Sequence, residues 1–355
     1  MVLWLKSLYK IMYKYTKSLV INVQASLFEN ISGRIKCTAC ARYCLLRDGQ
    51  SGFCGVRTAE NGHLNLDVYN FPYAFNIDPI EKKPLLHMYP GSRILSFGTS
   101  GCNFACKYCQ NFEMSQRKNV VGKYMTPEDI VKLARKSNVD GIAFTYNEPT
   151  IFMEFARDIG VLAHKYGFFN IFVTNGYETP ESMAMASEFL DAITIDFKGN
   201  GEEKFYNRYI SIPSPQLIFR TIKNALDYGI HTEITDLIIP EIGDNLEEAK
   251  NMIQKIKDIA GEYIPLSFRR YHPDYKLSIP STPFVTLKNH YDLAKSIGMK
   301  YVYLGNVPEE QYENTYCPAC GNLLITRHIF DSRVTGLNSN GNCLKCGFQT
   351  GIRIK

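Results

Sequence analysis

The clearest pattern along the chain is a regular alternation of short apolar runs with longer amphipathic stretches, from about residue 93 to about residue 308. The apolar runs are rich in β-branched and aromatic residues, which is typical of strands. They predict seven strands, at Arg93–Thr99, Gly141–Thr145, Asn170–Thr174, Ala192–Asp196, His231–Ile239, Leu266–Tyr271 and Tyr301–Leu304. Strand–helix repetition of this kind predicts parallel β/α units. Seven strands are too few for the closed eight-fold barrel, so we expect a partial barrel or an open sheet.

Helix boundaries between these strands are well marked. Thr126-Pro127-Glu128-Asp129 combines an N-cap residue, a proline at the first helical position and two acids in the first turn. The helical patterns 150–166 and 215–228 each end just before a glycine, which favours a helix terminus. The middle of the chain, residues 93–308, is therefore expected to be one α/β domain.

Three segments lie outside this region. In residues 3–28, apolar positions alternate with lysines at roughly helical spacing, so a basic amphipathic helix is predicted for the segment 1–36. Residues 37–92 are expected to hold a module with four cysteines, followed by a proline-rich wrapping segment without a clear period. Residues 309–355 form a short tail with two pairs of cysteines.

Composition places the chain among ordinary globular proteins. Its 355 residues are 45% hydrophobic and 21% charged, which is too apolar for a disordered chain. No uncharged stretch is long enough to span a membrane, and the lysine-rich start does not resemble a signal peptide. We therefore expect a cytoplasmic protein with no membrane partner. The net charge of +5 is concentrated at the two ends, which leaves contact with nucleic acid open but weakly supported.

The eleven cysteines fall into clusters of four, three and four residues, with none left over. An odd number in a chain without a leader argues against a disulfide framework, so three metal sites are expected. The central cluster, Cys102, Cys106 and Cys109, follows the first predicted strand. Three thiolates can hold three irons of a [4Fe–4S] cluster, which leaves the fourth iron free to bind a small molecule. Zinc is the competing metal, but three thiolates without a nearby fourth ligand would be an unusual zinc site.

Cys-x3-Cys-x2-Cys, with an aromatic residue before the last cysteine at the start of a β/α region, resembles the radical S-adenosylmethionine (SAM) superfamily. This resemblance implies a (β/α)6-type partial barrel, a [4Fe–4S] cluster and SAM bound to its free iron. Reductive cleavage of SAM in that superfamily yields a 5′-deoxyadenosyl radical, which abstracts hydrogen from a substrate.

Later segments resemble, more narrowly, the branch of pyruvate formate-lyase activating enzymes. These segments lie at predicted strand ends and are 144–150, 173–176, 195–199, 237–240 and 271–275. The N-terminal half, with its four cysteines and the sequence Asp78-Pro79-Ile80-Glu81-Lys82-Lys83-Pro84-Leu85, resembles the radical SAM enzyme of the AmmeMemoRadiSam system. The resemblance covers roughly residues 36–308 and identifies the chemistry without the substrate.

The resemblance also implies roles for individual residues. Cys102, Cys106 and Cys109 would bind the cluster, and Tyr146-Asn147-Glu148 would receive the SAM amino group. Thr174 and Asn175 would lie near the ribose or carboxylate of SAM, and Asp196 and Lys198 match an Asp-x-Lys pair whose lysine lies near an anionic group. Val173 replaces a second aspartate of the activating enzymes, so their monovalent cation site is not expected here. His272 matches a histidine near the adenosyl end of the pocket, which would give it a direct role there. The alternative for this residue is a structural hydrogen-bonding role.

The two outer clusters are each suited to a metal. Cys317, Cys320, Cys343 and Cys346 form two Cys-x2-Cys pairs with the spacing of a zinc ribbon, although rubredoxin-like iron would fit the same arrangement. Cys37, Cys40, Cys44 and Cys54 fit a structural zinc, which we favour, or a second, closed [4Fe–4S] cluster that passes electrons.

The predicted function is thus hydrogen abstraction by a radical SAM enzyme with an unknown substrate, which could be a glycyl-radical-type protein or a gene-cluster partner. Such an enzyme needs an electron donor of the flavodoxin or ferredoxin type. One alternative is a radical SAM enzyme that modifies tRNA or another RNA and binds this RNA through the basic ends of the chain. A second is a non-catalytic zinc-ribbon protein that binds nucleic acid, but it leaves Cys102, Cys106 and Cys109 unexplained.

Overall fold

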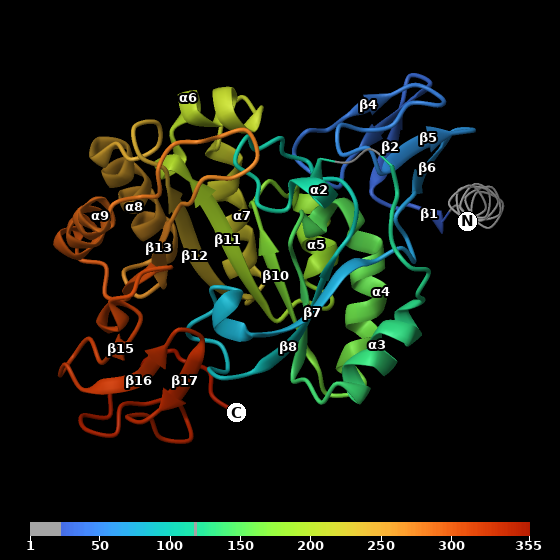
Figure 1. Ribbon diagram of the computed structural model, residues 1–355. Helices are drawn as coiled ribbons and strands as arrows, with labels where there is room; N and C mark the ends of the chain where they lie inside the picture. Colours follow the sequence, from blue (N-terminus) through green and yellow to red (C-terminus); the bar gives the residue numbers. More distant parts are fainter. Residues whose placement is uncertain (1–22, 117–118) are drawn as a thin grey trace, which may run out of the picture.

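The computed structural model describes residues 23–116 and 119–355, and an eight-stranded sheet forms its centre (Figure 1). Seven parallel strands follow one another across this sheet in chain order. They are β8 (Arg93–Gly98), β9 (Gly141–Phe144), β10 (Phe169–Thr174), β11 (Ala192–Lys198), β12 (His231–Ile238), β13 (Leu266–Arg270) and β14 (Val302–Gly305). These are the seven predicted strands, and the expected α/β class with a parallel sheet is confirmed. Within the described residues, β14 and β7 are the two edges of the sheet, so hydrogen bonding does not close it into a barrel.

The eighth strand, β7 (Tyr73–Pro79), was not predicted. It lies in the expected wrapping segment and pairs antiparallel with β8 at the sheet edge. A register shift between Tyr73 and Asn76, with Ala74 at a positive φ of 58°, interrupts the alternation that would have identified a strand. Pro79, at the end of β7, is compatible with an edge strand.

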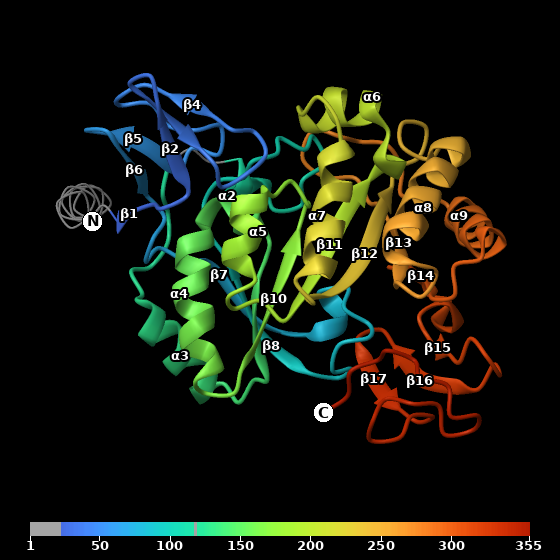
Figure 2. The same cartoon turned by 180° about the vertical axis from the view of Figure 1, so that it is seen from behind.

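Helices cover one face of the sheet, as Figure 2 shows from behind. The longer ones are α3 (Pro127–Lys136), α4 (Met153–His164), α5 (Pro180–Ala186), α7 (Gln216–Asp227), α8 (Leu246–Ala260) and α9 (Phe284–Ile297). Short helical turns are η1 (Ile80–Lys82), α2 (Phe112–Ser115), η2 (Pro149–Phe152), η3 (Gly199–Gly201), α6 (Glu203–Phe205), η4 (Tyr206–Ile210) and η5 (Glu310–Tyr312). The predicted N-cap is present: Thr126 and Asp129 form a capping box at the start of α3. No helix in the described residues is long and apolar enough to cross a membrane.

The N-terminal part of the described chain consists of short strands. They are β1 (Val23–Gln24), β2 (Phe28–Ile31), β3 (Arg34–Cys37), β4 (Leu45–Leu46), β5 (Arg57–Glu60) and β6 (His63–Leu66), arranged in two three-stranded antiparallel sheets. The helix predicted for residues 1–36 is therefore wrong for residues 23–36, and residues 1–22 lie outside the described part. A hairpin turn at Ser32-Gly33, both at positive φ, directs this segment into strands.

The tail forms a third antiparallel sheet, of β15 (Thr315–Tyr316), β16 (Leu323–His328) and β17 (Asp331–Val334). It docks beside the amino ends of the parallel strands, where Arg327 Nη2 donates to the Leu86 carbonyl at 2.6 Å and Arg353 N donates to His87 O at 2.9 Å. The N-terminal strands lie at the other end, next to α2 and α5 (Figure 1). The two outer cysteine clusters therefore lie at opposite ends of the central sheet.

Candidate active site

The three central cysteines lie on one loop, which follows β8 at the carboxyl end of the sheet. This is the end at which β/α folds carry their chemistry. Asn147, after β9, fixes the start of the loop: its Nδ2 donates to Thr99 Oγ1 at 3.1 Å and to the Gly101 carbonyl at 2.9 Å. Gly101 has a φ of +85°, and a Cβ at this position would lie 2.3 Å from the Cys54 carbonyl oxygen. The loop is thus held from β9 on one side and from the N-terminal strands on the other.

The thiols of this loop suit an iron–sulfur cluster. Cys106 is buried, Cys102 and Cys109 are half-buried, and all three are free. Burial raises the pKa of the Cys102 thiol, and the charges of Glu148, Cys106 and Cys109 raise it further. The Phe104 amide donates to Cys102 Sγ at 3.4 Å, a contact that favours a thiolate ligand. Three free, partly enclosed thiols next to a cation, Lys198, are a donor set that fits the cluster expected from the sequence.

Lys198 and Asp196 lie at the end of β11 and form an ion pair with 3.6 Å between Nζ and Oδ2. Burial lowers the pKa of Lys198, but Asp196, Cys106, Asp236 and Cys109 raise it, and the net direction is upward. Lys198 therefore remains a cation beside the cysteine loop. Thr235 donates its hydroxyl hydrogen to Asp196 and holds that carboxylate in place. This pair can contact an anionic group bound above the thiols.

Glu148, which the resemblance assigned to the SAM amino group, is buried in the protein and only 1% exposed. Its Oε1 accepts hydrogen bonds from the Thr150 amide at 3.1 Å and the Thr174 hydroxyl at 2.8 Å. Its Oε2 accepts from the Asn175 amide at 2.8 Å. Burial raises the pKa of Glu148, and the charge of Glu178 raises it further, while burial raises the pKa of Glu178 to about 7. Glu148 thus ties η2 to the end of β10.

Tyr146 and Asn175 are also engaged with the protein. Tyr146, at a φ of +70°, donates its hydroxyl hydrogen to Asp78 Oδ2 at 2.8 Å, and Lys83 Nζ contacts the same carboxyl group at 2.6 Å. The Asp78–Leu85 sequence that carried part of the resemblance therefore supports the strand end that holds Tyr146. Asn175 Nδ2 donates to Asn103 Oδ1, inside the cysteine loop, at 2.7 Å.

His272 lies beside the cysteine loop, on the segment that follows β13. Its Nε2 is 2.6 Å from Nε2 of Gln110, the residue after Cys109. The rings of Tyr275 and Phe112 stack with centroids 4.6 Å apart, and the Lys276 amide donates to the Lys107 carbonyl at 2.9 Å. The segment containing His272 therefore covers the loop from the side of β13, although His272 itself is exposed.

The outer clusters differ in spacing. The thiols of Cys317, Cys320, Cys343 and Cys346 all lie within 4.8 Å of one another, which suits a single ion. Cys37, Cys40, Cys44 and Cys54 gather next to the cysteine loop, at the edge formed by residues 177–179.

Sequence reasoning missed several residues of this region. One is Arg42, which donates to the Asn103 and Ser211 carbonyls. Another is Glu178, which lies near Glu148. Tyr206 and Asp236 lie near Lys198. No local pattern marks them, because their contacts cross long stretches of chain.

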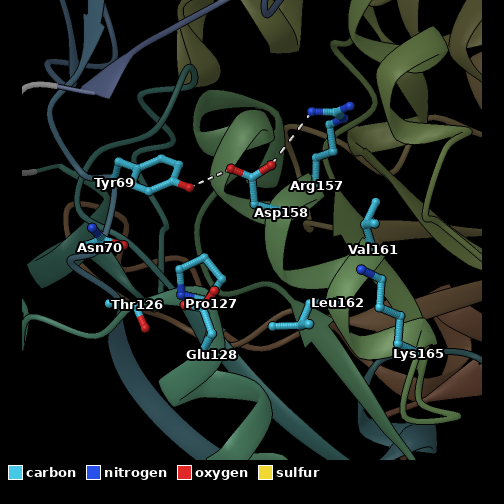
Figure 3. A pocket seen from close by; sticks show the side chains of 10 residues that line it. All are labelled: Tyr69, Asn70, Thr126, Pro127, Glu128, Arg157, Asp158, Val161, Leu162 and Lys165. Carbon is cyan, nitrogen blue, oxygen red and sulfur yellow. Dashed lines mark hydrogen bonds and ion pairs between the residues drawn. The ribbon is translucent and has the colours of Figure 1, made fainter.

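A surface pocket between α3 and α4, lined by Tyr69, Glu128 and Asp158 among others (Figure 3), contains none of the predicted site residues.

Comparison with known proteins identifies a family that the central part of the chain resembles. Residues 97–256 match the sequence model of the Radical SAM superfamily. The chain is 41% identical over 334 residues to an uncharacterized protein of Methanocaldococcus jannaschii, an overlap of 93% of this chain and 99% of that protein. It is 26% identical over 208 residues to a protein of the same organism, named provisionally as a glycyl-radical enzyme activating enzyme, with 58% of this chain and 76% of that protein covered.

Solved structures with a similar arrangement include a radical SAM methyltransferase from Sphaerobacter thermophilus. Its TM-score is 0.49 at 12% identity, with 66% of this chain and 71% of that chain covered. A domain of a pyruvate-formate lyase-activating enzyme from Bacteroides vulgatus has a TM-score of 0.41 at 17% identity, with 47% of this chain and 99% of that chain covered.

Proposed function

The chain belongs to the radical SAM superfamily, and on this premise we propose that it is an enzyme that cleaves SAM reductively and abstracts a hydrogen atom from a protein substrate. The observation that supports this proposal best is the meeting of three free thiols and the Asp196–Lys198 pair at the carboxyl end of the sheet. When bound, the cluster and SAM would supply the electron transfer and the 5′-deoxyadenosyl radical.

The residues of the chain bind, orient and enclose these groups. Cys102, Cys106 and Cys109 would ligate three irons. Lys198 would contact the SAM carboxylate; this role is supported by its charge beside the cysteine loop and by its long 3.6 Å ion pair with Asp196. The segment after β13 packs on the loop through the Tyr275–Phe112 stack, which would limit the access of water to the radical. His272 is a candidate for contact with the adenosyl end.

Two further residues support the site from beneath. Glu148 accepts three hydrogen bonds from η2 and from residues 174–175, so its main role would be to fix the position of the strand ends. Asn147 would act in the same way on the cysteine loop. Contact of Thr174 and Asn175 with the ribose or carboxylate of SAM stays a prediction. Their side chains are already bonded within the protein, Thr174 to Glu148 and Asn175 to Asn103, so such contact would need an exchange of partners.

A protein substrate is favoured by the similarity to the protein named as a glycyl-radical enzyme activating enzyme, which covers 58% of this chain. The residue that receives the radical would then lie on a separate glycyl-radical-type partner. A donor of the flavodoxin or ferredoxin type would supply the electron. The four tail cysteines would bind a structural zinc, because their spacing fits one tetrahedral ion. Modification of RNA, the alternative function based on the positive charge of the two chain ends, stays a prediction.

The decisive experiment measures 5′-deoxyadenosine. The protein is purified without oxygen, reconstituted with iron and sulfide, reduced with dithionite and given SAM. We expect 5′-deoxyadenosine from the wild type and none from a variant with Cys102, Cys106 and Cys109 all replaced by Ala. Exposed Lys132, on α3, provides a matched control, since Lys132→Ala should leave the yield unchanged. Product from the triple variant would refute the proposed function.

A further inference from the structure

Arg269, which has no role in the function proposed above, lies on the same face of the sheet as Lys198. Lys198 is in register with Leu237 of β12, and Leu237 is in register with Arg269 of β13, the next strand along (Figure 1). Residues in register point to the same face of a sheet, whereas neighbours along a strand point to opposite faces. Phe268, the neighbour of Arg269, faces the helices, because its ring centroid lies 5.5 Å from that of His290 on α9. Arg269 and Lys198 therefore share the face that points away from the helices.

The guanidinium of Arg269 is largely enclosed, yet none of its N–H groups donates a hydrogen bond within the residues that the structure describes. Its side chain is 13% exposed, and its ion-pair partner is Glu313, whose Oε1 lies 3.7 Å from Nη1, too far for a hydrogen bond. Buried Arg57 differs, since all three of its guanidinium nitrogens donate, to the Ile151 carbonyl and the Glu154 carboxylate. The N–H donors of Arg269 are therefore available to a ligand.

Gly305 provides the space that this guanidinium occupies. The glycine is in register with Arg269 on the neighbouring strand, β14. A Cβ at position 305 would lie 1.5 Å from Arg269 Nη1 and 2.4 Å from its Cζ, so the arginine side chain crosses the strand directly over this glycine. Any larger residue there would displace the guanidinium. The sheet itself thus fixes where the cation lies, on a rigid element at the carboxyl ends of the strands.

The protein compensates the charge of Arg269 only in part. Burial lowers its pKa, and the carboxylates of Glu313, Asp196 and Glu233 raise it without reversing the shift. Ser267 lies two residues earlier on the same face of β13 and is 3% exposed, and its hydroxyl has no hydrogen-bond partner among the described residues. Enclosed polar groups without partners are uncommon in native proteins. Here two of them follow one another on one face of a strand, which indicates a site for a polar ligand.

A carboxylate fits this arrangement better than a phosphate does. The planar guanidinium can offer two parallel N–H groups to the two oxygens of a carboxylate. A phosphate dianion would be repelled more strongly by Glu313 and Asp196, which lie near the same cation. On a protein substrate, a single negative charge of this shape is the side chain of aspartate or glutamate.

We propose that Arg269 binds an aspartate or glutamate side chain of the protein substrate, about three residues from the residue that loses its hydrogen atom. Arg269 lies two strand spacings, about 10 Å, from Lys198 beside the cysteine loop, and an extended chain spans this distance in about three residues. The proposal rests on the proposed function for the nature of the substrate. Selection of acidic peptides, however, can be measured without any cleavage of SAM.

The test offers a pool of hexapeptides with blocked ends to the full-length protein, which is reconstituted with iron and sulfide without oxygen and immobilised. Each peptide has one fixed glycine and random residues elsewhere, and the retained peptides are sequenced by mass spectrometry. We expect Asp and Glu to be enriched over Asn and Gln by about tenfold or more, the factor that a hydrogen bond to a charged group gives. Arg269→Gln should abolish this selection. Arg333→Gln, which changes an exposed arginine of the tail, is the matched control and should keep it.

Gly305→Ala tests the geometry, because the added methyl group displaces the guanidinium while every charge remains. Selection of acidic peptides should fall in this variant as well. The iron content and the thermal midpoint of both variants should equal those of the wild type, which shows that they fold.

The outcomes separate this proposal from its rivals. A wild type without acidic selection, or selection that persists in Arg269→Gln, would overturn it. A loss of SAM affinity in Arg269→Gln with unchanged peptide selection would assign the guanidinium to the SAM carboxylate and would also overturn it. Acidic selection by a protein that forms no 5′-deoxyadenosine would contradict the proposed function and leave the carboxylate site supported.

Discussion

Asn175, at the end of β10, donates a 2.7 Å hydrogen bond from its side-chain amide to Oδ1 of Asn103, which lies between two cysteines of the central loop. Both side chains are buried, so neither can replace this partner with water. The contact joins a strand end to the cysteine loop across 72 residues of chain. It makes the position of the loop depend on the sheet beneath it.

Asn175→Ala should lower the free energy of unfolding by about 1–3 kcal/mol, because it leaves the Asn103 carbonyl buried without a donor. Iron retention after reconstitution should fall with it. A double-mutant cycle in chemical denaturation with Asn103→Ala measures the coupling, and Asn251→Ala, on the exposed face of α8, is the control. Additive effects of the two substitutions would show that the contact has no energetic role.

Lys198→Met should weaken SAM binding by about 1.5–3 kcal/mol, the range for hydrogen bonds to charged groups. The cation lies beside the thiols without ligating iron, so the iron content should stay unchanged. Calorimetric SAM titration and iron analysis of the same sample separate the two effects. Exposed Lys204, on α6, is the matched control as Lys204→Met. Equal SAM affinity in the wild type and both variants would assign Lys198 a purely structural role.

Glu148→Gln should act mainly on stability. Glutamine offers one acceptor oxygen where Glu148 uses two, for the Thr174 hydroxyl and the Thr150 and Asn175 amides. We expect a loss of about 1–3 kcal/mol in the free energy of unfolding, because one buried donor loses its acceptor. SAM affinity should change less than in Lys198→Met. A large loss of affinity with unchanged stability would instead support direct contact of Glu148 with the SAM amino group.

Acid should destabilise the protein through His87. Burial lowers the pKa of His87 to about 3, and Glu233 raises it only in part, while Arg327 and His231 lower it further. The folded pKa is below the unfolded value of about 6.5, so the stability contributed by neutral His87 is present above pH 6.5 and is lost as the pH falls toward 3. The slope should approach about 1.4 kcal/mol per pH unit in this window. Urea unfolding at several pH values should show a flatter slope for His87→Gln than for His63→Gln, an exposed control.

Removal of the zinc proposed for the tail should affect folding and leave the reduced cluster intact. Cys343→Ser should release zinc and lower the thermal midpoint, because metal-ligand bonds stabilise so small an antiparallel sheet. The tail docks at the amino ends of the strands, so the spectrum of the reduced SAM-binding cluster should be unchanged. Full stability after chelation of zinc would show that the metal is not needed for folding.

The parallel sheet could be predicted from the sequence because each strand is a separate apolar run, marked by local caps such as Thr126 and Asp129. β7 could not, since its irregular register at Ala74 hides the alternation, and the lysine-rich start masked the hairpin at Ser32-Gly33. The cysteine loop was evident from its spacing alone. The burial of Glu148 and the position of Arg42 depend on contacts between distant segments, which no window of sequence contains.

The close approach of Cys54 to Gly101 has a consequence for which residues position 101 can accept. Any side chain at position 101 would place its Cβ 2.3 Å from the Cys54 carbonyl oxygen and force the two segments apart. The backbone of the N-terminal strands therefore limits position 101 to glycine, although the two segments lie far apart in the sequence. A substitution there would move the first cysteine of the loop without altering any thiol of the chain.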